Sequence, residues 1–126
     1  MKQREIKFRA WDKEIKAFVY ITLLKGGQFI FEIPGVESKE GWNKKTLGEW
    51  HQYIGRHDKN GKEIFESDLI KVKDVIRRVV FIDGKFQLTG VDEMHNAFYD
   101  LQPSKELEVI GNWWVRLYFE YSALMS

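Results

Sequence analysis

The feature that most constrains this chain is a series of short apolar segments separated by dipeptides that favour tight turns. Gly26-Gly27 and Asp83-Gly84 each stand between two segments rich in β-branched and aromatic residues, and Asn60-Gly61 adds a third turn signal. Glycine reaches the positive φ values that a tight hairpin turn requires. Segments of this composition on both sides of such a turn are typical of antiparallel strands. The pattern therefore predicts a fold built from β-hairpins.

About eight segments have the composition or the alternation of strands, and no segment has the period of a strong amphipathic helix. The segments lie at residues 5–11, 15–24, 28–33, 68–73, 75–82, 85–89, 107–110 and 113–121. We predict a mainly β fold, a small barrel-like antiparallel sheet with irregular loops and little helix. Residues 1–46 are expected to form an N-terminal β-hairpin subdomain. Residues 47–126 are expected to form a small β-barrel-like domain that ends in an aromatic strand.

Composition excludes several classes of protein. The 126 residues fit one compact domain better than two large ones. The chain has no cysteine, which excludes a disulfide scaffold, a thiolate zinc site, an iron–sulfur cluster and a cysteine nucleophile. No basic and apolar leader opens the sequence, and its apolar runs are shorter than the roughly 18 residues of a membrane helix. We expect a cytoplasmic protein with no membrane partner.

Three segments carry a resemblance to a known family. They are REIKFRAWDKE at residues 4–14, QYIGRHDKNGKEIFESDLIKV at residues 52–72 and LEVIGN at residues 107–112. In this order they are similar to the opening, central and closing motifs of the YopX family of phage- and prophage-encoded proteins. The resemblance implies a phage or prophage origin, a location in the bacterial cytoplasm and a β-rich fold. It brings no activity and no catalytic residue, because the family is essentially uncharacterised.

The chain departs from the family's pattern in three places. Ser67 stands where the family usually has glycine between two acidic residues, which puts the tight turn there in doubt. An aromatic tail from Trp113 onward replaces a polar, proline-containing ending. Residues 18–45 match no pattern that we can name.

The candidate catalytic and metal-binding residues form no standard frame. A metal-dependent hydrolase using His57, Asp58 and Glu66 is the weakest hypothesis, because their spacing matches no known ligand set and a solvated turn explains the His-Asp pair. A calcium loop beginning at Asp58 fails because its twelfth position falls on Leu69. Glu66 and Asp68 can act as acid and base, but such pairs are more often solvated. We predict a protein that is not an enzyme and has no metal and no cofactor.

Charge is distributed unevenly although the net charge is only +1. Residues 1–16 contain six basic and three acidic side chains, residues 71–85 contain five and two, and residues 92–108 contain one and five. If the two basic segments lie side by side, they offer a cationic surface with a stacking ring, as in small β-barrels that bind single strands. The alternative is an ordinary set of strand-edge lysines. The predicted nucleic-acid-binding residues are Lys7, Arg9, Trp11, Lys71, Lys73, Arg77 and Arg78.

The C-terminal tail predicts contacts between copies. Residues 113–121 alternate with apolar side chains on both faces, and such a strand requires cover on each side. Aromatic residues are enriched at the centres of protein interfaces, although burial within the monomer explains the pattern equally well. The predicted oligomer interface consists of Trp113, Trp114, Tyr118 and Tyr121.

Two functions follow from these observations. The leading hypothesis is a non-enzymatic phage or prophage accessory protein, a self-associating β-rich module that binds a host or phage macromolecule. The alternative is a nucleic-acid-binding module that uses the basic strand face and tryptophan stacking.

Overall fold

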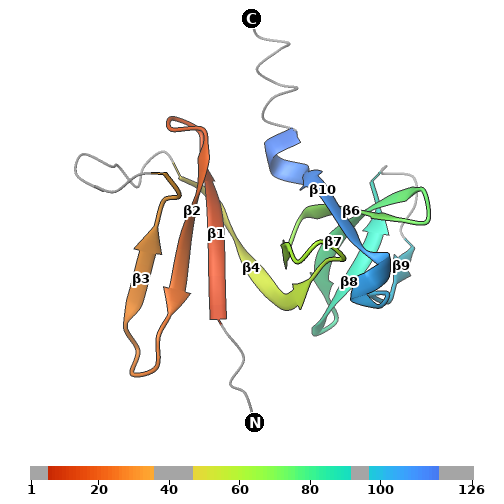
Figure 1. Cartoon of the computed structure of the whole chain (residues 1–126), viewed down its shortest axis with the longest axis horizontal. Helices are drawn as coiled ribbons and strands as arrows, with labels where there is room; N and C mark the ends of the chain where they lie inside the picture. The colour runs from red at the N-terminus through yellow and green to blue at the C-terminus, as the bar shows by residue number, and fades with distance from the viewer. Residues whose placement is uncertain (1–5, 36–46, 92–96, 117–126) are drawn as a thin grey trace, which may run out of the picture. The chain divides into compact units, whose positions relative to one another are not determined.

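A computed structural model of the chain describes residues 6–35, 47–91 and 97–116 (Figure 1). The chain divides into two compact units, Met1–Gly55 and Arg56–Ser126. The described residues form two antiparallel sheets of five strands each. The prediction of a mainly β fold with antiparallel sheets is therefore confirmed, although neither sheet closes into a barrel. The predicted boundary between residues 46 and 47 stays a prediction, because a compact unit does not by itself show a subdomain that folds independently.

The first sheet has the strand order β3-β2-β1-β4-β5. Its strands are β1 (Ile6–Asp12), β2 (Ala17–Leu23), β3 (Phe29–Glu32), β4 (Leu47–His57) and β5 (Glu63–Phe65). The predicted hairpin at Gly26-Gly27 is confirmed, since both glycines have positive φ and Leu23 pairs with Phe29. The strand β4 begins in the first unit and ends in the second.

A buried aspartate closes the connection between β1 and β2. Asp12 has no exposed surface, and its Oδ1 accepts hydrogen bonds from the backbone N–H groups of Glu14 (2.9 Å) and Ile15 (3.2 Å). Its carbonyl oxygen accepts a third from the N–H of Lys16 at 2.8 Å. An aspartate side chain can bond the backbone two residues on, which is why it favours turns. The end of the opening motif is therefore a turn-forming element.

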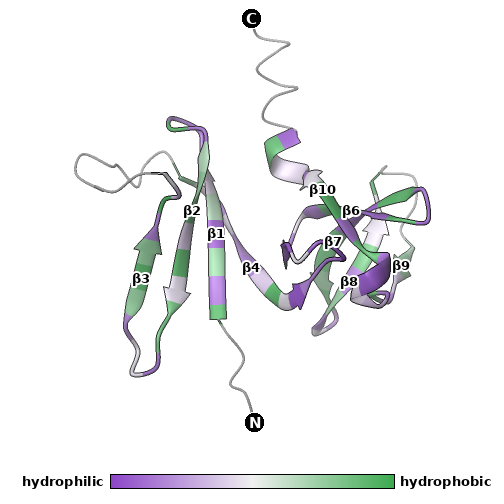
Figure 2. Cartoon of the chain, in the orientation of Figure 1, coloured by the Kyte–Doolittle hydropathy of each residue, from purple (hydrophilic) through white to green (hydrophobic). Residues whose placement is uncertain are grey.

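The second sheet has the strand order β10-β6-β7-β8-β9. Its strands are β6 (Asp68–Val72), β7 (Val75–Ile82), β8 (Lys85–Gly90), β9 (Phe98–Tyr99) and β10 (Glu108–Asn112), with a 3₁₀ helix at Ser104–Glu106. The predicted Asp83-Gly84 hairpin is confirmed, because both residues have positive φ and Ile82 pairs with Lys85. In Figure 2 the strands carry most of the apolar residues, and many of the turns are hydrophilic. The largest fully buried apolar side chains of this unit are Ile64, Phe65, Ile70, Val79, Leu88 and Leu107.

The aromatic tail begins as a helical turn, so the predicted strand is wrong for residues 113–116. The Asn112 Oδ1 accepts hydrogen bonds from the N–H groups of Trp114 (3.0 Å) and Val115 (3.3 Å). This is the arrangement of an asparagine helix cap, which satisfies N–H groups that have no partner within the first turn. Local capping therefore overrides the alternation of the tail. Residues 117–126, with Tyr118 and Tyr121, lie outside the described residues.

Candidate functional site

The carboxylate of Asp58 holds the central motif to the closing motif. Its Oδ1 accepts hydrogen bonds from the N–H groups of Asn60 (2.9 Å) and Lys62 (2.8 Å), and its Oδ2 accepts one from Val109 (2.9 Å). Burial by itself raises the pKa of this carboxyl, but the three N–H bonds and the charge of Lys62 lower it, and the net pKa is below its ordinary value. The stabilised anion is thus part of the fold and is not a free acid or base.

Asp68 plays a similar part at the other end of the motif. It has no exposed surface, and it accepts hydrogen bonds from the Phe65 N–H (2.8 Å) and the Asn112 side-chain amide (3.2 Å). His57 is exposed at the end of β4, and Glu66 is half-buried in the turn before β6. Among residues 6–35, 47–91 and 97–116, no three histidine or acidic side chains are placed to hold a metal ion. The structure thus does not gather the hydrolase candidates into a site.

The predicted nucleic-acid-binding residues of the first unit lie against aromatic rings. Arg9 is only 5% exposed, and its guanidinium lies 4.1 Å from the centroid of the Phe18 ring. The Trp11 ring meets the same phenyl ring edge-on at 5.2 Å. Lys7 is half-buried, with its Nζ 5.9 Å from the centre of the Tyr53 ring. Arg9 and Trp11 are therefore engaged in internal packing.

The other predicted residues lie in the second unit, on β6, β7 and the turn between them. Lys71 is paired with Asp74 at 3.9 Å. Arg78 lies over the ring of Trp113 at 5.0 Å, and burial lowers the pKa of its guanidinium. The two predicted groups thus belong to different units and different sheets. Two of the four predicted oligomer-interface residues lie in the described part of the chain. Trp113 is half-buried, whereas Trp114 is 43% exposed.

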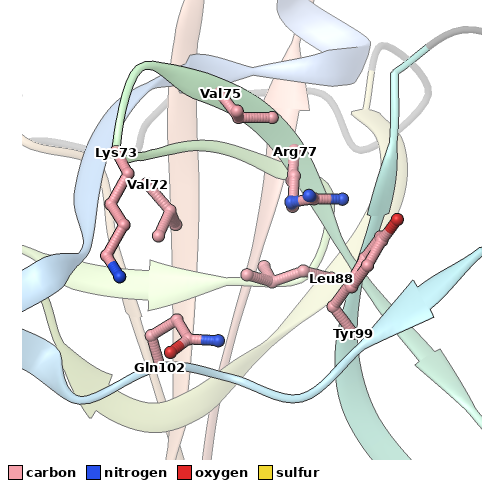
Figure 3. A pocket seen from close by; sticks show the side chains of 7 residues that line it. All are labelled: Val72, Lys73, Val75, Arg77, Leu88, Tyr99 and Gln102. Atoms are coloured by element: carbon pink, nitrogen blue, oxygen red, sulfur yellow. The ribbon is translucent and has the colours of Figure 1, made fainter.

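The two remaining cations, Lys73 and Arg77, line a pocket of about 230 Å³ within the second unit (Figure 3). The pocket is lined by Val72, Lys73, Val75, Arg77, Leu88, Tyr99 and Gln102. The β6–β7 turn presents Lys73, which has φ of 47°. Strand pairing brings Leu88 opposite Tyr99 and Val72 opposite Val75. Side chains from β6, β7, β8 and β9 and from the β6–β7 turn thus line a common space.

The pocket is cationic. The Arg77 guanidinium lies over the Tyr99 ring at 3.6 Å from the centroid, a stacking contact that orients it. No acidic side chain lines the pocket. The nearby carboxylates of Asp74 and Asp100 pair with Lys71 and Lys85 instead. Within the described residues, neither Lys73 nor Arg77 forms an ion pair, so the arrangement is suited to a carboxylate or a phosphate.

Of the seven lining residues, only Lys73 and Arg77 were predicted from the sequence as site residues, and five were missed. Tyr99 lies in the segment 94–101, which shows no clear pattern, and Gln102 follows it. Both residues are far in sequence from Lys73, and the pairing of β8 with β9 places Tyr99 opposite Leu88 at the pocket. No spacing rule connects such residues, whereas the cluster of basic side chains at residues 71–85 is visible in the sequence.

These features describe a protein of two antiparallel sheets with a small cationic pocket in its second unit. Residues 7–115 match the family described as YopX protein, so the chain belongs to the YopX family and the predicted resemblance is confirmed. The chain is also similar to protein EF1440 from Enterococcus faecalis, known from a crystal structure. The two share 24% identity, with 85% of this chain and 92% of that chain covered and a TM-score of 0.48. No curated protein matches the sequence. Over the described residues, no helix is long and apolar enough to cross a membrane.

Proposed function

We propose that this YopX-family protein is a non-enzymatic accessory module of a phage or prophage that binds a host or phage macromolecule through an anionic group. The observation that carries the proposal is the pocket lined by Lys73 and Arg77, two cations for which the described residues provide no carboxylate partner. Two positive charges that line one pocket raise its potential, and an anion in the pocket is attracted by both.

The acidic side chains support a non-enzymatic role. Asp12, Asp58 and Asp68 are buried, and the carboxylate of each accepts hydrogen bonds from backbone N–H groups. The buried imidazole of His51 faces Arg9 and Glu49, both on the first sheet and outside the pocket. The pocket itself holds a lysine, an arginine, a tyrosine and an amide, which bind and orient an anion.

The environments of the predicted basic residues favour a protein partner over a nucleic acid. A nucleic-acid surface needs a row of cations along the backbone of the strand. Here Lys71 is paired with Asp74, and Arg9 is buried against Phe18. Nucleic acid remains the alternative function, and oligonucleotide probes decide between the two.

The test is fluorescence anisotropy with three labelled probes, an oligoglutamate peptide, a single-stranded DNA and a duplex, each at low and moderate salt. Lys73→Glu removes a pocket cation, and Lys25→Glu is its matched control because Lys25 is exposed in the turn between β2 and β3. We expect at least one of the three anionic probes to bind the parent chain. Its affinity should be about tenfold weaker for Lys73→Glu and unchanged for Lys25→Glu. No binding at low salt, or equal weakening by both variants, overturns the proposal.

Self-association is a second candidate function, favoured by apolar side chains that stay exposed. Trp114 on the helical turn is exposed, as are Phe29 and Ile30 on β3, with Phe29 at 56%. Large aromatic side chains are enriched in protein interfaces. Light scattering behind a sizing column, over a hundredfold range of protein concentration, tests the candidate. A mass that stays at one chain throughout contradicts it, and a larger mass that Trp114→Gln or Phe29→Ser reduces supports it.

A further inference from the structure

We infer that the pocket recognises the C-terminal residue of a protein partner. The main-chain carboxylate is held by Arg77, Lys73 adds positive charge from the other side of Leu88, and an aliphatic last side chain packs on Val72, Val75 and Leu88. The inference rests on the proposed function and names its ligand: an extended peptide end, with the terminal carboxylate and an apolar side chain as its two recognised groups.

Arg77 provides the carboxylate site. The Arg77 guanidinium is stacked on the ring of Tyr99, so its N–H groups, which lie in the guanidinium plane, remain at its edge. A planar fork of N–H donors matches the two oxygens of a carboxylate. Lys73 adds a second positive charge from the turn, and the amide of Gln102 adds a neutral donor. In Figure 3 these side chains surround one space, with Leu88 between them.

The apolar wall decides among anions. Val72 and Leu88 are buried at the base, and Val75 is 46% exposed at the rim. A phosphate uses the cations but leaves this wall uncovered, and the side chain of an aspartate or glutamate brings a carboxylate with little apolar surface. A C-terminal leucine or valine carries a carboxylate and an aliphatic group on the same Cα. Such a residue therefore provides an anion for the cationic side chains and buries the apolar side chains of the pocket at the same time.

The size and place of the pocket agree with a peptide end. Its volume of about 230 Å³ is below the roughly 300–1,000 Å³ of sites that enclose drug-sized ligands. Tyr99 both lines the pocket and belongs to β9, the last strand in the sheet order. In the described part of the chain, no strand pairs with the outer edge of β9. An extended peptide that leaves the pocket along this edge can add to the sheet as peptides do in strand-addition complexes.

The experiment is an NMR titration of the ¹⁵N-labelled full chain with N-acetyl-leucine, which carries the carboxylate and side chain of a peptide end. The comparison ligands are N-acetyl-leucinamide, N-acetyl-glycine and inorganic phosphate. We expect saturable shifts at the amides of Lys73, Val75 and Tyr99 with N-acetyl-leucine. Binding should be at least about fivefold weaker for N-acetyl-glycine, which lacks the apolar group, and absent for the amide, which lacks the charge.

Two variants separate the two recognised groups. Arg77→Gln should abolish binding of both acids, and Val75→Ser, at an exposed rim position, should weaken N-acetyl-leucine but not N-acetyl-glycine. Lys25→Gln is the control, and a thermal melt verifies that each variant folds. Equal binding of the amide, equal binding of N-acetyl-glycine, or tighter binding of phosphate at the same amides overturns the inference. Phosphate binding alone leaves the proposed function standing, whereas no shift with any of these ligands and no binding of the polyanionic probes overturns both.

Discussion

The indole N–H of Trp114 donates a hydrogen bond to the hydroxyl of Ser67 at 3.1 Å, and so joins two positions at which this chain departs from the YopX pattern. Ser67 has a positive φ of 67°, a conformation that glycine adopts without steric cost. The Ser67 N–H donates to Val79 at 2.7 Å, and its carbonyl accepts from Trp113 at 2.8 Å. Ser67 thus has a backbone conformation that is unfavourable for serine, and its hydroxyl forms a hydrogen bond with the aromatic tail.

This relationship predicts a coupling between the two positions. In the Trp114→Phe background, Ser67→Gly should raise the free energy of unfolding by about 1 kcal/mol, because glycine relieves the left-handed conformation. In the parent chain the gain should be smaller by about 0.5 kcal/mol, because the same substitution also removes a partly exposed hydrogen bond. Urea denaturation of the four proteins measures the difference as a double-mutant cycle. Equal effects in both backgrounds would show that the bond contributes nothing.

The stability of the chain should depend strongly on Asp58 of the central motif. Asp58→Ala leaves three backbone N–H groups without their acceptor, and we expect the free energy of unfolding to fall by about 3 kcal/mol. Asp58→Asn keeps one acceptor oxygen and should cost less. Asp74→Asn is the control, because the Asp74 side chain is almost fully exposed and its surface ion pair is worth little. An Asp58→Ala variant as stable as the control contradicts the prediction.

The lowered pKa of Asp58 gives this contribution a pH dependence. The pKa in the folded state is below the ordinary pKa of an aspartate. The carboxylate therefore stabilises the fold at pH values above the ordinary pKa, and this contribution is lost as the pH falls through the folded-state pKa. The parent chain should therefore lose stability below about pH 4 more steeply than Asp58→Asn. Denaturation midpoints between about pH 5 and pH 2 measure the two slopes. Parallel curves would show that another carboxyl controls the acid limb.

His51 predicts a second pH dependence, in a separate range. Burial first, and then the charge of Arg9, lower the pKa of this imidazole from 6.5 to about 4. The carboxylate of Glu49 lies 3.9 Å from Nε2, but it is largely exposed and does not reverse the shift. The unfolded chain binds the proton more readily than the folded chain, so stability is full above pH 6.5 and falls as the pH drops toward 4. At pH 5 the loss should be about 2 kcal/mol relative to pH 7.

The measurement is the free energy of unfolding at intervals between pH 7 and pH 4.5, for the parent chain and two variants. His51→Gln should remove most of the slope, since glutamine does not titrate. His57→Gln is the comparison, because it removes an exposed histidine near the end of the same strand, and the slope should remain steeper in it than in His51→Gln. The same slope in all three proteins would refute the assignment to His51.

The parts of the fold that could be predicted from sequence are those fixed by local chemistry. The hairpins at Gly26-Gly27 and Asp83-Gly84 follow from residues that tolerate positive φ next to strand-forming segments. The helical turn after Asn112 is also local, because asparagine is a strong helix cap. Alternation in the tail hides that signal, since residues 113–116 fit a strand pattern equally well.

The environment of Arg9 could not be predicted in this way. Its place in the alternation of β1 indicates a solvent-facing side chain, but β1 lies between β2 and β4, and Arg9 packs on Phe18 of β2. The pocket depends on strand order too, because Lys73, Leu88 and Tyr99 meet only through the pairing of β6 with β7, β7 with β8 and β8 with β9. A basic cluster can thus be recognised in the sequence, whereas the aromatic ring that orients one of its members cannot.

The turn that presents Lys73 to the pocket predicts opposite effects on stability and on binding. Lys73 and Asp74 both have positive φ, 47° and 67°, which is the two-residue geometry that favours asparagine followed by glycine. The paired substitution Lys73→Asn with Asp74→Gly should therefore raise the free energy of unfolding by about 1–2 kcal/mol. It also removes one of the two pocket cations, so the anionic probe should bind about tenfold more weakly.

Asp74→Gly alone separates the two effects. It relieves the turn but keeps Lys73, and it removes only a surface partner of Lys71. We expect this variant to be more stable than the parent chain and to bind the probe at least as tightly, because it removes a negative charge next to Lys73. Thermal melts and anisotropy titrations on the same protein samples measure both properties. If the paired substitution stabilises the chain and still binds like the parent, the strained turn serves no binding role and Lys73 is not part of the anion site.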